Sequence, residues 1–236
     1  MKKILFVIAV LTSFTAISQT VHDANAEVRN VSGFQGVSVS SAIDLYLSQG
    51  NSDAVAISAT DNDVRSRIKT EVKDGVLHIW FDGKGFKNWN NNNQKMRAYV
   101  TIKDIKRLKA TGASDVKVSG ILKAENLSLD FSGASDFEGA IDVRNINIDG
   151  SGASDIKING TATNANIEMS GASDFKGYDL KIDYCKADIS GAGNMQIHVN
   201  KELDAEASGA SSIKYKGDAV VKKMSSSGAS SIKKKA

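Results

Sequence analysis

The sequence predicts an all-β fold, a single-stranded parallel β-helix of about 19–20 residues per coil, with right-handed winding as the default for parallel crossovers. Three observations predict it. A motif of Ser or Thr followed by Gly-Ala recurs at nearly constant spacing. Apolar and polar residues alternate on both sides of each copy. The chain has 20 glycines and no proline, so glycine and asparagine must supply its turns.

The motif occurs seven times from residue 111 onward, and its glycines are separated by 21, 19, 19, 20, 18 and 19 residues. We interpret them as corners between strands, because glycine adopts positive φ without steric cost. The small alanine beside each glycine is expected to lie inside the corner. The seven corner glycines are Gly112, Gly133, Gly152, Gly171, Gly191, Gly209 and Gly228.

Alignment on these glycines reveals columns of apolar residues. The residue four positions after each glycine is apolar, from Val116 to Ile232, and so is the residue four positions before it. Six positions before the glycine, the middle coils are apolar and include Cys185, whereas the outer coils place Lys106 and Lys222 there, as is usual for terminal repeats. Each coil is therefore predicted to hold at least two short strands that meet at the Gly-Ala corner.

Residues 27–105 are also rich in alternating strands but lack the motif. They form either irregular coils of the same solenoid or a small β cap. Asp74-Gly75, between Val72 and Val76, indicates a hairpin turn.

The first residues have the features of a secretion signal. Lys2 and Lys3 precede an apolar run that ends near Ala16, and small residues favour cleavage after Ser18, with a second candidate site after Ala26. The run is shorter than the ~20 residues that span a bilayer. We therefore expect an exported protein in the periplasm, on the outer membrane surface or outside the cell, with no membrane span once the signal is removed.

The predicted organisation has four parts. Residues 1–18 are the signal peptide, 19–33 a lead-in, 34–217 the β-helix domain with motif repeats from 111, and 218–236 the last coil and a basic tail. The formal charge of +3 includes two lysines of the signal, so the mature chain is nearly neutral and is not expected to bind nucleic acid. The run Lys233–Lys235 is interpreted as a frayed, solvated end.

These features resemble one bacterial family. The stretch Val31–Val37, the alternating stretch Ile43–Leu47 and the Ser-Gly-Ala repeats are similar to the family described as putative auto-transporter adhesin, head GIN domain. The resemblance implies an exported cell-envelope protein with a right-handed parallel β-helix like that of pectin lyases. It implies no established activity and no catalytic residues.

The candidate metal ligands form one column. Asp115, Asp136, Asp155 and Asp174 share a repeat position, so stacking places their carboxylates ~5 Å apart. Ca²⁺ would relieve the repulsion with oxygen ligands. Most coils also carry a lysine two residues later, and paired acidic and basic columns make a balanced, solvated surface. We therefore expect no metal and no other cofactor, and keep the four aspartates as candidates for Ca²⁺.

Other chemistry-bearing residues favour structural roles. The repeated serines lack a neighbouring base, and we expect their hydroxyls to satisfy corner backbone groups. Cys185 is expected to be a small, inert core residue. Trp80, Phe86 and Trp89 lie in or beside the Asn-rich segment, where they either stack on a sugar or fold back over the end of the solenoid.

The expected function is a non-enzymatic adhesion or interaction scaffold that binds an envelope protein or a glycan. The alternative is a polysaccharide lyase or hydrolase on the same scaffold, which would use the acidic column together with Arg97 and Arg107. A regulatory or sensor subunit is a third alternative that the sequence neither supports nor excludes.

Overall fold

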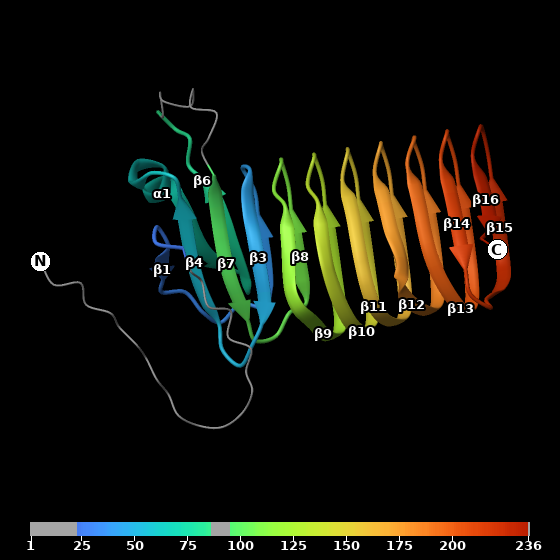
Figure 1. Cartoon of the computed structure of the whole chain (residues 1–236), viewed down its shortest axis with the longest axis horizontal. Coiled ribbons are helices and arrows are strands. Elements are labelled where there is room, and N and C mark those ends of the chain that lie inside the picture. The colour runs from blue at the N-terminus through green and yellow to red at the C-terminus, as the bar shows by residue number, and fades with distance from the viewer. Residues whose placement is uncertain (1–22, 86–94, 236) are drawn as a thin grey trace, which may run out of the picture.

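The computed structural model describes residues 23–85 and 95–235 and confirms an all-β solenoid of parallel stacked coils (Figure 1). The predicted signal peptide lies outside these residues. The elements are β1 (Glu27–Arg29), β2 (Gly36–Val39), β3 (Ile43–Gln49), β4 (Ala54–Ala59), α1 (Asn62–Arg67), β5 (Ile68–Lys73), β6 (Val76–Phe81), β7 (Met96–Ile102), β8 (Arg107–Ala110), β9 (Val116–Phe131), β10 (Phe137–Gly150), β11 (Asp155–Met169), β12 (Asp174–Ile189), β13 (Asn194–Ala207), β14 (Ser212–Lys216), β15 (Val220–Ser226) and β16 (Ser231–Lys234).

The middle coils differ from the prediction of two short strands per coil. Each of β9 to β13 is one strand of 14 to 16 residues that runs from one corner almost to the next. Each strand pairs in parallel with the strand of the following coil. The bend inside a coil is marked by irregular register, as between Glu138 and Ala140. Parallel pairing therefore continues around the bend, with local bulges taking up the change of direction.

The apolar columns form the core, as predicted. Val116, Phe137 and Phe175 are at most 1% exposed, and so are Leu129 and Ile148 from the column before the glycine. Because each column stacks the same kind of side chain from coil to coil, the core is continuous along the rod.

In the outer coils the buried residue lies one position away from the aligned core column. Lys106 and Lys222 do not take the inward position six residues before the glycine; both are exposed. Ile105 is buried instead, and Val221 is half-buried and pairs with Leu203 before the register shifts. At Lys222 the register shift leaves the lysine in solvent and brings Val221 inward.

The corners also differ from the prediction. The seven motif glycines do have positive φ, between 73° and 90°. However, the alanine that follows each of the seven is exposed, and the next residue fills the corner in most coils. Five of these inner residues are serines that are at most 3% exposed: Ser114, Ser135, Ser154, Ser173 and Ser211.

The buried serines satisfy backbone groups within the corner. The Ser154 Oγ–H donates to the carbonyl of Ser151 at 2.9 Å, and the Ser154 N–H donates to Oγ of Ser173 in the next coil at 3.3 Å. Ser211 repeats the first of these bonds with Ser208. The predicted hydroxyl ladder is present, and it lies inside the corner because a hydroxyl can satisfy polar groups that alanine cannot.

The N-terminal half combines both predicted alternatives. Strands β2 and β3 form a coil that lies between the coil of β6 and β7 and the coil of β8 and β9, and all of these pairings are parallel. Antiparallel strands β1, β4 and β5 complete the end of the rod, together with the short helix α1 (Figure 1). The β5–β6 hairpin turns at Asp74 and Gly75, both with positive φ, as predicted.

The predicted frayed C-terminus is wrong. Residues Ser231–Lys234 form β16, which pairs in parallel with β14 and places Lys233 beside Lys214. The N–H of Lys235 donates to the carbonyl of Tyr215 at 2.7 Å and extends the ladder. The terminal lysines are therefore held in register.

Candidate functional site

The aspartates chosen from the sequence do form one column. Asp155 pairs in register with Asp174, and the registers of the neighbouring coils place Asp136 and Asp115 in line with them. Two of these carboxylates accept hydrogen bonds from backbone N–H groups of the next coil. The N–H of Asp155 donates to Oδ1 of Asp136 at 3.0 Å, and the N–H of Asn194 donates to Oδ1 of Asp174 at 2.8 Å. The column therefore uses part of its acceptor capacity within the protein.

The neighbouring lysines engage the acidic groups of these coils. Lys176 Nζ lies 2.6 Å from a carboxylate oxygen of Asp155, and Lys157 Nζ lies 2.7 Å from Glu138. Within residues 23–85 and 95–235, no three His, Cys, Asp or Glu side chains are arranged to hold a metal ion. The geometry of the Asp column thus favours internal ion pairs and backbone hydrogen bonds over Ca²⁺ coordination.

The column extends into the N-terminal half, which the sequence did not reveal. Asp44 on β3 lies beside Asp115, and Arg97 on β7 lies beside Asp44. Burial and then the charge of Asp115 raise the pKa of Asp44. Arg97 Nη1 also lies 3.5 Å from Asp23, and the Tyr99 hydroxyl donates to the same carboxylate at 2.9 Å. Arg97, a candidate of the lyase hypothesis, is therefore held in a polar cluster.

A second acidic column runs along the other arm of the coils, three residues before each glycine. Its members are in register over five coils: Asp130, Asp149, Glu168, Asp188 and Glu206. The first and last acids of this column form ion pairs with lysines. Lys109 Nζ lies 2.7 Å from Asp130, and Lys223 pairs with Glu206. In the middle, burial, Glu168 and Asp130 raise the pKa of Asp149. Sequence reasoning missed this column, although its fixed offset from the glycines would have revealed it.

An amide ladder lies next to the acidic arm. The Asn145 amide donates to Asn126 at 2.9 Å, and the Asn164 amide donates to Asn145 at 2.8 Å. The same column continues with Tyr184, whose side chain is 40% exposed and lies 5.4 Å from Lys201 Nζ. Such ladders stabilise stacked coils and leave polar groups at the surface.

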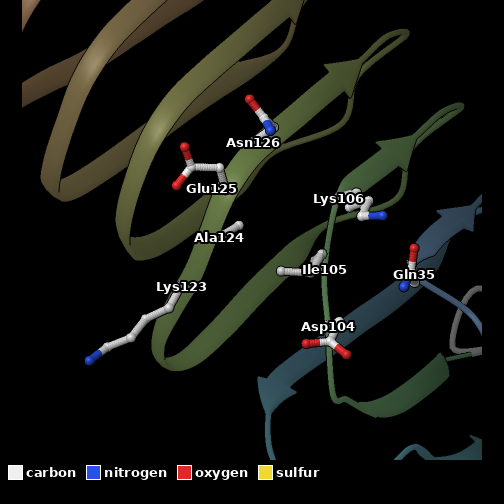
Figure 2. Close-up of a pocket in the computed structure, with 8 residues that line it drawn as sticks. All are labelled: Gln35, Asp104, Ile105, Lys106, Lys123, Ala124, Glu125 and Asn126. Carbon is white, nitrogen blue, oxygen red and sulfur yellow. The ribbon is translucent and has the colours of Figure 1, made fainter.

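The repeat is broken where the N-terminal coils meet the regular rod. There a shallow depression of about 200 Å³ is lined by Gln35, the segment 104–106 and the segment 123–126 (Figure 2). The Gln49 side chain forms hydrogen bonds with both sides of this junction. Its amide donates to the carbonyls of Lys103 and Lys123, and its oxygen accepts the N–H of Lys123. The depression is open, and its side chains project in different directions (Figure 2).

A basic surface lies at the C-terminal end of the Asp column. After Asp174 the column continues with Asn194, Ser212 and Ser231, so it loses its acids. The neighbouring outward position is Gln196 in the next coil and lysine in the last two coils. We call the following four residues the C-terminal basic array: Lys214, Lys216, Lys233 and Lys235. In the described part of the chain, none of the four pairs with a carboxylate, and each neighbouring ammonium pair costs up to about 1 kcal/mol of repulsion in water.

The aromatic candidates remain largely untested. Trp80 lies on β6 and is half-buried. Phe86 and Trp89 lie outside the described residues, so their proposed contact with a ligand stays a prediction.

Comparison with known proteins identifies relatives of this fold. The family model described as putative auto-transporter adhesin, head GIN domain, matches residues 33–219. No curated protein matches the chain. Among the described residues, no helix is long and apolar enough to cross a membrane.

Solved structures share the architecture over most of their length. A putative adhesin from Bacteroides fragilis has a TM-score of 0.82 at 24% identity, over 89% of this chain and 96% of that one. A putative lipid binding protein from Parabacteroides distasonis has a TM-score of 0.69 at 21% identity, over 91% and 98%. A putative adhesin from Parabacteroides merdae has a TM-score of 0.65 at 18% identity, over 91% and 98%. At these identities the likeness is one of fold.

Proposed function

This chain belongs to the putative auto-transporter adhesin, head GIN domain family, and from that premise we propose that it is exported to the cell envelope and acts there as a non-enzymatic adhesion or interaction scaffold. Its partner is an envelope protein or a glycan that lies along the faces of the rod. The N-terminal segment that is predicted to be a secretion signal supports export.

One observation carries the proposal: charged and polar side chains repeat in register over successive coils and do not converge on one point. The acidic arm from Asp130 to Glu206 presents one carboxylate per coil, ~4.8 Å from the next. Such a surface is long and flat, and it suits a partner that makes many similar contacts. A catalytic centre instead needs different groups to meet around one reacting atom.

The lyase alternative has less support from the geometry. Arg97 lies near Asp23 in the polar cluster, and Arg107 Nη2 lies 3.8 Å from Asp130. Asp155 is paired with Lys176. These groups belong to three separate ion pairs, with no shared substrate position.

The scaffold is tested by capture from envelope extracts with the immobilised protein, and by surface attachment of cells with and without the gene. Asp149→Asn combined with Glu168→Gln is the informative variant, because it removes two charges from the middle of the acidic arm and leaves the core intact. The wild-type protein is expected to capture a specific partner. Cells without the gene, and cells with the double variant, are expected to attach less. Turnover of an acidic polysaccharide by the purified protein, lost on Asp155→Ala, would overturn the proposal in favour of an enzyme.

A further inference from the structure

The C-terminal basic array is a charged surface that the protein's own carboxylates leave unbalanced. We propose that it binds an acidic polysaccharide, an extended polymer that carries carboxylate or sulfate groups. The inference deepens the proposed function by naming a class of ligand, and it rests on that function only for the location of the ligand outside the cytoplasm. Four observations carry it.

The first observation is a contrast within one column. In the middle coils, Lys157 and Lys176 lie two residues from the Asp column and pair with Glu138 and Asp155. In the last coils the Asp positions are occupied by asparagine and serine. The same kind of lysine therefore has a carboxylate partner in one part of the face and none among the described residues in the other.

The second observation is that the lysines are held in order. Lys214 and Lys233 are register partners on β14 and β16, which lie side by side at the C-terminal end of the rod (Figure 1). Neighbouring strands lie ~4.8 Å apart, and residues two apart on one strand lie ~6.8 Å apart. The four ammonium groups therefore extend from a regular two-by-two arrangement that a polymer with repeated anionic groups can follow.

The third observation is that two of the lysines converge on one aromatic ring. Lys216 Nζ lies 5.3 Å and Lys235 Nζ 4.6 Å from the ring centroid of Tyr178. The ring attracts each cation but does not remove their mutual repulsion. An anionic group near Tyr178 would attract both ammonium groups and offset part of their mutual repulsion.

The fourth observation separates a polysaccharide from a membrane surface. Proteins that bind anionic membranes through basic residues usually also insert apolar side chains. The large exposed apolar side chains of the described residues are Val28, Ile121, Tyr184, Val220 and Met224. None lies on β14 or β16, and Val220 and Met224 belong to β15, which pairs with a different part of β13. Strands β14 and β16 therefore carry none of the large exposed apolar side chains of the described residues.

The test measures binding of the purified protein to polygalacturonate, dextran sulfate and neutral dextran by titration calorimetry at low and high salt. The variant Lys214→Gln with Lys233→Gln removes two charges of the array and introduces the residue that Gln196 already supplies in the same column. The matched control is Lys157→Gln with Lys176→Gln, which makes the same change of net charge. Thermal unfolding of both variants checks that they remain folded.

We expect the wild type to bind at least one of the two polyanions and to bind dextran at least about tenfold more weakly, with an affinity that falls as salt screens the charges. The array variant is expected to lose about tenfold in affinity and the control less than about twofold, since Lys157 and Lys176 pair with carboxylates of the protein and Lys214 and Lys233 do not pair with any among the described residues. Equal losses in the two variants, or no binding of either polyanion by the wild type, would overturn the proposal. Binding to vesicles that contain phosphatidylserine, without polyanion binding, would identify a membrane surface instead.

The two proposals fail in different ways. If polyanion binding depends on the array but the protein has no envelope partner and no effect on attachment, the adhesion scaffold is wrong and the array stands. If attachment requires the protein but the array variant supports it fully and no polyanion binds, the array is wrong and the scaffold stands.

Discussion

Asp44 lies beside Asp115 in one outward column, although 71 residues separate the two strands at this point. The N–H of Leu45 donates to the carbonyl of Asp115 at 2.7 Å and fixes this register. The carboxylate of Asp44 is thus held against a like charge, and burial together with that charge raises its pKa. The junction between the N-terminal coils and the regular rod therefore has a pH-dependent stability.

Asp44→Asn is predicted to stabilise the protein at neutral pH. A carboxyl whose pKa is raised by folding favours the folded state at low pH, and this contribution is lost as the pH rises through the folded pKa. The gain at pH 7 is expected to be below about 1 kcal/mol, because Asp44 is only half-buried and Arg97 and Lys117 offset part of the effect. Thermal midpoints at pH 7 and pH 3 check this, and the gain should vanish at pH 3.

The control for this prediction is Asp155→Asn, which removes an acid of the same column that is paired with Lys176. It is expected to be neutral or slightly destabilising at pH 7. Equal stabilisation by both variants would show that repulsion along the whole column dominates, and not the junction.

Gly152→Ala is predicted to destabilise the corner strongly. An added Cβ would lie 2.4 Å from the carbonyl oxygen of Gly133, and φ is +81°. Gly120→Ala separates the two effects, because Gly120 has φ of +82° and nothing within 4 Å of an added Cβ. The control is expected to lose about 1–2 kcal/mol from backbone strain alone. Gly152→Ala is expected to lose at least about 1 kcal/mol more, since the clash involves backbone.

Chemical denaturation of both glycine variants measures the difference. Similar losses of unfolding free energy in the two variants would mean that neighbouring corners move apart to relieve the clash at no energetic cost. The hydrogen bonds between corners argue against this. One such bond joins the N–H of Ala153 to the carbonyl of Gly133 at 2.8 Å.

Ser173→Ala is predicted to cost about 1–3 kcal/mol, because it removes the acceptor for the buried N–H of Ser154. The exposed Ser170 is the control, and Ser170→Ala should change the unfolding free energy by less than about 0.5 kcal/mol. If both substitutions are neutral, the corner serines fill space without contributing hydrogen bonds.

Cys185 is predicted to be unreactive in the folded protein. Burial raises the pKa of its thiol to about 12, and the side chain is 5% exposed between Ala165 and Leu203 of the neighbouring coils. Since the thiolate is the nucleophile, a disulfide reagent at pH 8 should label the thiol only after unfolding. Rapid labelling of the native protein would show that the coils open locally at this position.

The sequence by itself determined the repeat, the positions of the corners and the apolar columns of the rod. These features follow from local chemistry, because positive φ selects glycine and alternation decides which side chains face inward. From one coil to the next the spacing is nearly constant, so the columns around Phe137 and Ile156 could be aligned before the structure was known.

Only the tertiary structure decided which coils are neighbours in the N-terminal half. Strand β3 lies between β7 and β9, so the chain places an early coil between two later ones. Local periodicity does not specify such a partner, since any strand with the same alternation satisfies it. The contact between Asp44 and Asp115, the inward exchange of Val221 for Lys222 and the ordered lysines of β16 all depend on pairing between coils, and pairing is a property of the folded rod.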